Sequence, residues 1–222
     1  MNFSKTLILA AVACVAPVVG FADSVAVTSN PSMSINGMTF SGFGCNVNYH
    51  GTAVSPSDCG GISVGTITQP GVGISFTSLF SANPDSKATV WDDAVLSYNV
   101  ASKAAISAVG LDFNGYIEGH AITSVTESIY TDSNFVNQVG FAKVSCDKAG
   151  CTQVDNITLN GSYNDLFIKK DISVQATGSN SATQISYVDQ TFTATPEPGS
   201  TALLGSGLLA IAGLLRRRAI KK

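Results

Sequence analysis

Two adjacent carboxylates, Asp92 and Asp93, follow the single tryptophan of the chain, Trp91, and Asp85 lies shortly before them. Neighbouring carboxylates in a loop supply the hard oxygen ligands that Ca²⁺ prefers. The spacing matches neither an EF-hand loop nor a calcium-binding nonapeptide repeat. Asp85, Asp92 and Asp93 are therefore candidate calcium ligands that no recognised motif supports, and we predict no metal centre and no cofactor.

A second pair of carboxylates could serve glycoside hydrolysis. Glu118 and Glu127 are the only glutamates between residues 23 and 195, and hydrolysis needs two carboxyl groups about 5–10 Å apart. If residues 121–130 form one strand, Glu127 lies about 20 Å or more along it from Glu118. We therefore expect both glutamates on solvated surfaces.

The histidines give no sign of a nucleophilic triad. The chain has two, His50 in a stretch rich in glycine and asparagine and His120 after Gly119 at an expected turn. No Gly-x-Ser-x-Gly sequence singles out a serine nucleophile. We expect both imidazoles to be exposed and predict that the protein has no catalytic residue and is not an enzyme. A surface hydrolase is therefore the least favoured of three functional hypotheses.

Aromatic side chains offer a different chemistry, because rings can stack on sugars. Trp91 together with Tyr98, Tyr116 or Tyr130 could form such a platform, although rings of this kind more often pack in a core or at a strand edge. A carbohydrate-binding module, assisted by calcium or not, is therefore the alternative function.

Four cysteines remain outside the N-terminal apolar segment, and an even number in an exported chain indicates two disulfides. Three pairings are possible; we favour the local ones, Cys45–Cys59 and Cys146–Cys151, the second at the tip of a hairpin. The spacings, with thirteen and four intervening residues and no two histidines at the spacing of zinc ligands, do not fit the usual zinc sites.

The elements that must position these residues are strands. Apolar and polar residues alternate in many short runs, and in residues 23–195 Gly, Ser, Thr and Asn make up 70 of 173 residues, a composition typical of turn-rich β structure. The clearest runs are residues 74–80, 96–100, 109–113, 121–130, 139–141, 157–159, 172–174 and 185–187. Turns are expected at residues 114–115, 160–161 and 178–181.

Eight or more short strands at this spacing predict an all-β fold, a single antiparallel β-sandwich or jelly-roll-like domain over residues 23–195. Residues 101–108, a weak helical candidate, are expected as a strand or edge. Residues 23–73 are less regular, with short strands at 25–28, 35–40 and 62–67, and we assign them to the same domain.

The charge of this domain limits its partners. Residues 23–195 contain six lysines, no arginine and fourteen acidic residues, a formal charge of −8. Such a surface repels anionic polymers, so we predict no nucleic-acid binding. With 45% hydrophobic residues the chain is also unlike an intrinsically disordered one.

Residues 1–22 have the pattern of a signal peptide. Lys5 precedes an apolar run over residues 7–19, and small residues precede an expected cleavage after Ala22. A retained N-terminal anchor, or a lipoprotein with Cys14 as its acceptor, is the alternative.

Residues 201–215 are apolar and uncharged, and Arg216, Arg217 and Arg218 follow at once. Fifteen residues make about 22 Å of helix, a little short of the ~30 Å apolar core of a bilayer, which a thin bilayer accommodates. The positive-inside rule keeps the arginines cytoplasmic, so the domain lies outside the membrane. The expected signal peptide and the C-terminal segment therefore both place the domain on the outer side of the membrane.

Pro196, Glu197 and Pro198 precede this helix. The order of Pro-Glu-Pro, short apolar helix and arginine cluster over residues 196 to about 218 resembles the PEP-CTERM sorting tail of exosortase substrates. The resemblance implies that a membrane-embedded cysteine protease of the exosortase type processes the tail (196–222) near the tripeptide. It also implies a transient inner-membrane anchor, followed by release to the cell surface or extracellular matrix.

The sequence thus predicts an exported, non-enzymatic surface or matrix protein. Because PEP-CTERM systems accompany exopolysaccharide production, the resemblance implies an association with extracellular polysaccharide or biofilm.

Overall fold

The computed structural model describes residues 24–52 and 54–195, together with Ser206. Within these residues the chain forms antiparallel strands and two short 3-10 helices. The elements are β1 Val25–Ala26, η1 Val27–Ser29, β2 Met33–Ile35, β3 Met38–His50, β4 Val54–Ser55, η2 Cys59–Gly61, β5 Ser63–Ile67, β6 Gly73–Ala82, β7 Thr89–Phe113, β8 Tyr116–Glu118, β9 Ala121–Tyr130, β10 Gln138–Asp147, β11 Gly150–Thr152, β12 Val154–Thr177 and β13 Ala182–Thr195.

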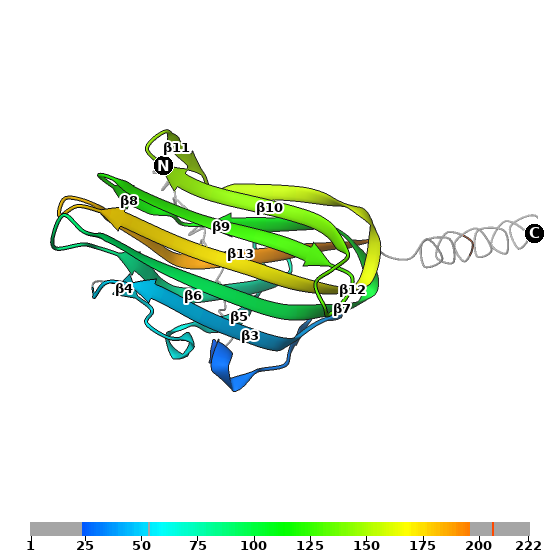
Figure 1. Cartoon of the computed structure of the whole chain (residues 1–222). Coiled ribbons are helices and arrows are strands. Elements are labelled where there is room, and N and C mark those ends of the chain that lie inside the picture. Colours follow the sequence, from blue (N-terminus) through cyan, green and yellow to red (C-terminus); the bar gives the residue numbers. More distant parts are fainter. Residues whose placement is uncertain (1–23, 53, 196–205, 207–222) are drawn as a thin grey trace, which may run out of the picture.

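Two long strands, β7 and β12, pair along almost their whole length and belong to both layers of a β-sandwich. Residues 89–101 of β7 and 165–177 of β12 lie in a front sheet with the order β3-β7-β12-β9-β10-β11. Residues 105–113 of β7 pair with β13 in a back sheet, where β13 continues to β6, β5 and β1. Figure 1 shows the back-sheet strands behind the front sheet. The predicted β-sandwich is confirmed.

The core lies between the sheets and follows the alternation of the strands. On the front half of β7, the even-numbered residues from Val90 to Val100 are buried and the odd-numbered ones are partly exposed. Phe43 of β3 and Phe76 of β6 both pack on the Tyr98 ring, with ring centroids 5.6 Å away in each case. Phe40 of β3 contacts Phe192 of β13, also at 5.6 Å. Aromatic side chains therefore join the two sheets through the core.

Both predicted disulfides, Cys45–Cys59 and Cys146–Cys151, are present. The predicted turn at residues 178–181 joins β12 to β13, and the tip of the second disulfide hairpin lies between Asp147 and Gly150. Residues 101–108 are part of β7, as expected.

Two expectations about local structure are wrong. The predicted turn at residues 160–161 lies inside β12, where pairing with β7 shifts register between Thr158 and Tyr163. The chain there passes from one sheet to the other, so turn-forming residues produce an irregularity within a strand rather than its end. The segment after Phe40, expected to be irregular, continues as β3 to His50 because it pairs with β7.

Candidate functional site

The structure does not bring the three candidate calcium ligands together. Asp92 and Asp93 are consecutive in β7 and therefore point to opposite faces of the front sheet, with Asp92 buried and Asp93 on the outer face. Asp85 is exposed in the connection before β7. Among the described residues, no group of three or more His, Cys, Asp or Glu side chains is arranged to hold a metal ion.

Asp92 is a buried carboxyl whose two oxygens have no hydrogen-bond partner. Burial, with a smaller contribution from the negative charge of Asp93, raises the pKa of Asp92 from 3.8 to about 7. A carboxyl in this position is protonated in mildly acidic solution and costs stability when it ionises.

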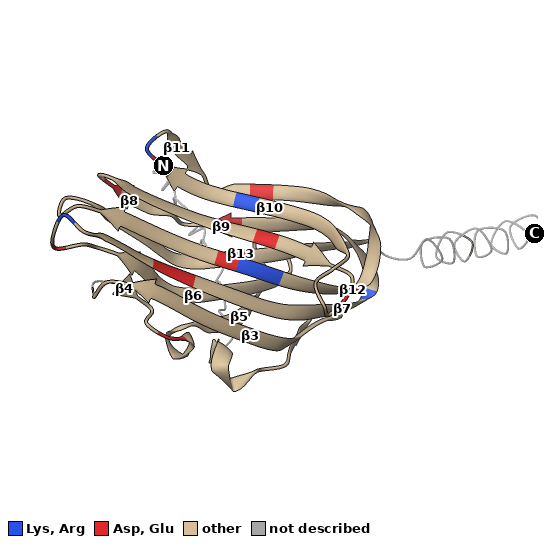
Figure 2. Cartoon of the chain, viewed as in Figure 1, with Lys and Arg blue, Asp and Glu red and all other residues tan. Residues whose placement is uncertain are grey.

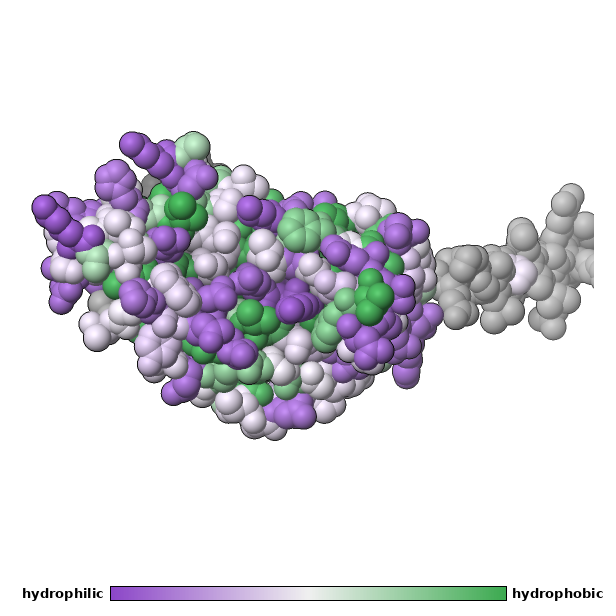
Figure 3. All heavy atoms as spheres, viewed as in Figure 1, coloured by the Kyte–Doolittle hydropathy of each residue, from purple (hydrophilic) through white to green (hydrophobic). Residues whose placement is uncertain are grey.

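The outer face of the front sheet is polar across its centre. The register aligns Asn46, Val95, Asp171, Thr126 and Lys143 in one row across five strands. The charged segments of β7, β9, β10 and β12 accordingly lie near one another in Figure 2, and Figure 3 shows polar and small residues over most of this face. Burial and the neighbouring carboxyl of Asp93 raise the pKa of Asp171 to about 6.

The two glutamates have different surroundings. Glu118 is exposed and accepts a hydrogen bond from the Tyr116 hydroxyl at 3.4 Å, as expected. Glu127 is fully buried, so the prediction of a solvated surface is wrong for this residue. On β9 it has the same parity as Val125 and Ile129, both in the core, and its strand position therefore places it between the sheets.

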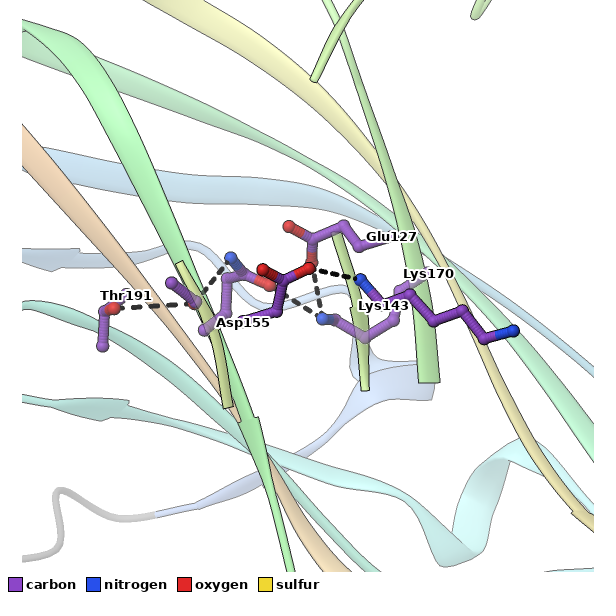
Figure 4. Close-up of polar contacts among 7 residues, drawn as sticks. Glu127, Lys143, Asp155, Lys170 and Thr191 are labelled. Carbon is purple, nitrogen blue, oxygen red and sulfur yellow. Dashed lines mark hydrogen bonds and ion pairs between the residues drawn. The ribbon is translucent and has the colours of Figure 1, made fainter. Parts of the chain in front are cut away.

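Glu127 belongs to a polar network inside the core. The Lys170 amine donates to Glu127 Oε2 at 2.5 Å and to Gln190 Oε1 at 2.7 Å, and all three residues are fully buried. Gln190 Nε2 donates to the Gly110 carbonyl at 3.0 Å, and the Thr191 hydroxyl reaches the same carbonyl at 3.5 Å. Figure 4 shows this chain of contacts between Glu127 and Thr191. Lys170 and Gln190 were not singled out from the sequence.

The aromatic residues do not gather into the candidate sugar-stacking platform. Tyr98 lies in the core, and Tyr116 is exposed on β8. Trp91 and Tyr130 face the outer side of the front sheet several register positions apart, and Tyr130 packs edge-on against Phe135. Trp91 stacks instead with His50, with ring centroids 6.3 Å apart.

Both histidines are exposed, as predicted. His120 lines a hollow of about 490 Å³ together with Ile122, Asp147, Lys148 and Gln175. No acid–base partner is hydrogen-bonded to either imidazole among the contacts of the described residues.

A second hollow, of about 460 Å³, lies on the outer face of the back sheet and was missed from the sequence. Asp112 of β7 and Asp189 of β13 are directly opposite each other there, and Asn156 and Thr191 flank the glycine at position 110. Burial raises the pKa of both aspartates, and the negative charge of Asp112 adds to the effect on Asp189. Close carboxyls with raised pKa values, beside an amide and a hydroxyl, offer hydrogen bonds to a polar ligand.

Strand β13 ends at Thr195, directly before the tripeptide of Pro196, Glu197 and Pro198. Its last residues still pair with β7, Thr195 opposite Ala105. The expected signal peptide (1–22), the tripeptide and Arg216–Arg218 lie outside the described residues, as does the expected helix over residues 201–215 apart from Ser206. Among the described residues, no helix is long and apolar enough to cross a membrane.

Comparison with solved structures finds distant likenesses only. TmCBM61, a carbohydrate-binding module solved with β-1,4-galactotriose, is 12% identical over 67% of this chain and 88% of its own, with a TM-score of 0.33. The enzymatically active domain of tailspike protein 4 from bacteriophage CBA120 is 11% identical over 67% of this chain and 19% of its own (TM-score 0.31). The mannan-recognising module TmCBM27 is 10% identical over 78% of this chain and 98% of its own, with a TM-score of 0.23. At these scores the likenesses support no inference about ligand or activity.

Comparison in sequence is informative for the tail. No curated protein matches the chain. The family model of the PEP-CTERM protein-sorting motif matches residues 194–218, which begin within the last residues of β13 and include the tripeptide and the arginine cluster. The tail therefore identifies the chain as an exported surface protein that carries a PEP-CTERM protein-sorting motif.

Proposed function

We propose that this protein is a non-catalytic exosortase substrate whose β-sandwich is displayed outside the cell after its tail has been processed. The observation that carries the proposal is the position of the sorting motif, which matches from residue 194, immediately where the last strand of the domain ends. A protease that cuts near the tripeptide removes the tail without removing any strand of the sandwich. The acidic, arginine-free domain suits an extracellular matrix of neutral or cationic polymers.

The chemistry of proline also suits the tripeptide to a protease. Proline has no N–H to donate and fixes φ, so Pro196 and Pro198 cannot extend the ladder that β13 makes with β7. Neither proline therefore suits the hydrogen-bonded ladder of a sheet, and proteases bind extended segments that do not pair within the substrate.

The test is to replace Pro196, Glu197 and Pro198 by alanine in the full chain and to fractionate the cells. We expect the variant to stay in the inner-membrane fraction at full length, while the wild type moves to the surface or medium. A control with Ser179 and Asn180 replaced by alanine, in the β12–β13 turn, should be released like the wild type. Unchanged release of the tripeptide variant would overturn the proposal.

A second candidate function is binding of polysaccharide hydroxyl groups in the back-sheet hollow. Asp112, Asp189 and Asn156 line it and supply acceptors and an amide donor, the groups that orient sugars in concave sites. A glycan array probed with the released protein, with and without Ca²⁺, tests this function. Glycan binding should be lost in Asp112→Asn and in Asp189→Asn. It should be retained in Asp85→Asn, because Asp85 is exposed and remote in sequence from the hollow. Equal binding by the three variants would exclude the hollow as the glycan-binding site.

A further inference from the structure

The buried network of Lys170, Glu127 and Gln190 lies outside the sorting motif, and none of its three side chains lines the back-sheet hollow. Lys170 and Glu127 are opposite each other on β12 and β9 of the front sheet, whereas Gln190 comes from β13 of the back sheet. All three side chains are fully buried. A lysine, a glutamate and a primary amide thus meet in the middle of an apolar core, a costly arrangement unless their contacts are satisfied or the groups react.

The amine and the amide are close enough for attack at carbon. Lys170 Nζ lies 2.7 Å from Gln190 Oε1, and a carbonyl bond is about 1.2 Å long. The distance from Nζ to the amide carbon is therefore at most about 4 Å, close to the separation of reacting atoms in near-attack geometries. The Gly110 carbonyl accepts from Gln190 Nε2 at 3.0 Å and so holds the amide in one orientation.

The core also favours the protonation states that such a reaction needs. Burial lowers the pKa of the Lys170 amine, and burial raises the pKa of the Glu127 carboxyl, although the opposite charge of each partner acts against both effects. A neutral amine has the free electron pair of a nucleophile, and a neutral carboxylic acid can give and take protons. Glu127 Oε2 accepts the hydrogen bond from the amine, and Glu127 Oε1 has no hydrogen-bond partner.

We propose that Lys170 and Gln190 form an intramolecular isopeptide bond that joins the two sheets, with Glu127 as the group that moves the protons. Lys170 first transfers a proton to Glu127, leaving a neutral amine. The amine electron pair then forms a bond from Nζ to the Gln190 amide carbon, and the carbonyl π electrons move to Oε1. Glu127 supplies a proton to Nε2 and recovers one from Nζ.

The intermediate then collapses, the bond from the amide carbon to Nε2 breaks, and ammonia leaves. The product is a secondary amide between the two side chains. Two protons have left Nζ: one is in the departing ammonia and the other stays on Glu127, which ends as a neutral acid. No oxidant, reductant or cofactor is required.

The bond would add a covalent connection that the disulfides do not provide. The disulfides join cysteines 14 and 5 residues apart, and neither connects β12 to β13. An amide is also insensitive to the thiols that reduce disulfides. A protein displayed outside the cell would therefore keep its two sheets joined under reducing conditions.

The test is mass spectrometry of the purified full chain and its peptides. Loss of ammonia lowers the intact mass by about 17 Da, but Asn-Gly sequences at residues 36, 114 and 160 can also lose ammonia. Cleavage before aspartate locates the loss, because it separates residues 165–170 from the peptide that begins at Asp189. We expect these two peptides joined through Lys170 and Gln190. Recovery of the two peptides unlinked from the folded wild type would overturn the proposal.

Variants assign the roles. Lys170→Met should give unlinked peptides, while the matched control Lys169→Met, which changes the exposed neighbour on the other face of β12, should remain linked. In Glu127→Ala the linked fraction should fall by about 100-fold at equal times after synthesis, the usual contribution of a positioned acid or base. A link formed equally fast in Glu127→Ala would exclude Glu127 from the reaction.

Discussion

Charged and polar groups inside the sandwich are the residue-level feature with the most consequences. Asp92, Glu127, Lys170 and Gln190 are each fully buried. Asp92 differs from the others because neither of its oxygens has a hydrogen-bond partner. Its carboxyl is therefore tolerated chiefly in the protonated form.

We predict that Asp92→Asn stabilises the protein increasingly as the pH rises from about 4 to about 7, and to the full extent above about pH 7. The pKa of Asp92 is about 7 in the folded state against 3.8 as its ordinary value, so between these values the folded state binds more protons than the unfolded state. Stability therefore falls as pH rises through this window. Urea unfolding should show a gain for Asp92→Asn of about 1–3 kcal/mol at pH 8 and almost none at pH 4.5. An equal gain at both pH values would contradict the assignment.

The positions of these residues could have been predicted from strand parity. The alternation that places Leu96 and Tyr98 in the core also places Asp92 there, since all are even-numbered residues of one strand. The same rule assigns Lys170 to the side of Ile168 and Ile172. The wrong prediction for Glu127 rested on its distance from Glu118 along the expected strand, which does not decide the face to which a side chain points. The sequence does not show which polar residues meet across the sheets, because that depends on how strands far apart in the chain pair and pack.

At the scale of elements, the pairing of β6 with β13 depends on a glycine. A Cβ at Gly73 would lie 1.7 Å from the Gln190 backbone carbonyl oxygen, whereas a Cβ at Gly44 would meet only the Ser97 hydroxyl, at 2.5 Å. A side chain can rotate away, but a paired strand cannot shift without losing its hydrogen bonds.

Gly73→Ala should therefore lower the free energy of unfolding by about 3 kcal/mol or more, and Gly44→Ala by less than about 1 kcal/mol. Urea titrations of the two variants against the wild type measure the difference. Similar losses for the two variants would show that the close approach of β6 to β13 is not rigid.

The first disulfide connects β3 of the front sheet to η2, which precedes β5 of the back sheet. Replacing Cys45 and Cys59 by alanine should lower the free energy of unfolding by about 3 kcal/mol, because the unfolded chain regains the freedom that the bridge removes. The matched change at Cys146 and Cys151, which close a shorter loop, should cost less, about 2 kcal/mol. Thermal unfolding of both double variants shows which disulfide contributes more stability. A larger loss for the Cys146 and Cys151 variant would contradict the prediction.

The fold class and both disulfide pairings could be predicted because they depend on local alternation and spacing. The double role of β7 and β12 could not, because a strand that changes sheets has the same local pattern as two strands with a turn between them. Asn160 and Gly161 show the ambiguity: these residues favour a turn, yet long-range pairing of β12 with β7 on both sides of them keeps the strand continuous.

At the scale of the whole molecule, an acidic β-sandwich is followed at once by a sorting tail. The last strand of the described residues ends at Thr195, and the match to the PEP-CTERM motif begins at residue 194. Charge and position agree with a domain that functions outside the membrane, separated from its tail near the tripeptide.

The most direct test is to determine the C-terminal residue of the protein recovered from the cell surface or medium, by mass spectrometry of its C-terminal peptide. We predict a new terminus close to residues 195–199, with residues 201–222 absent, and a membrane-associated precursor that still ends at Lys222. Surface protein that retains the arginine cluster and ends at Lys222 would contradict it.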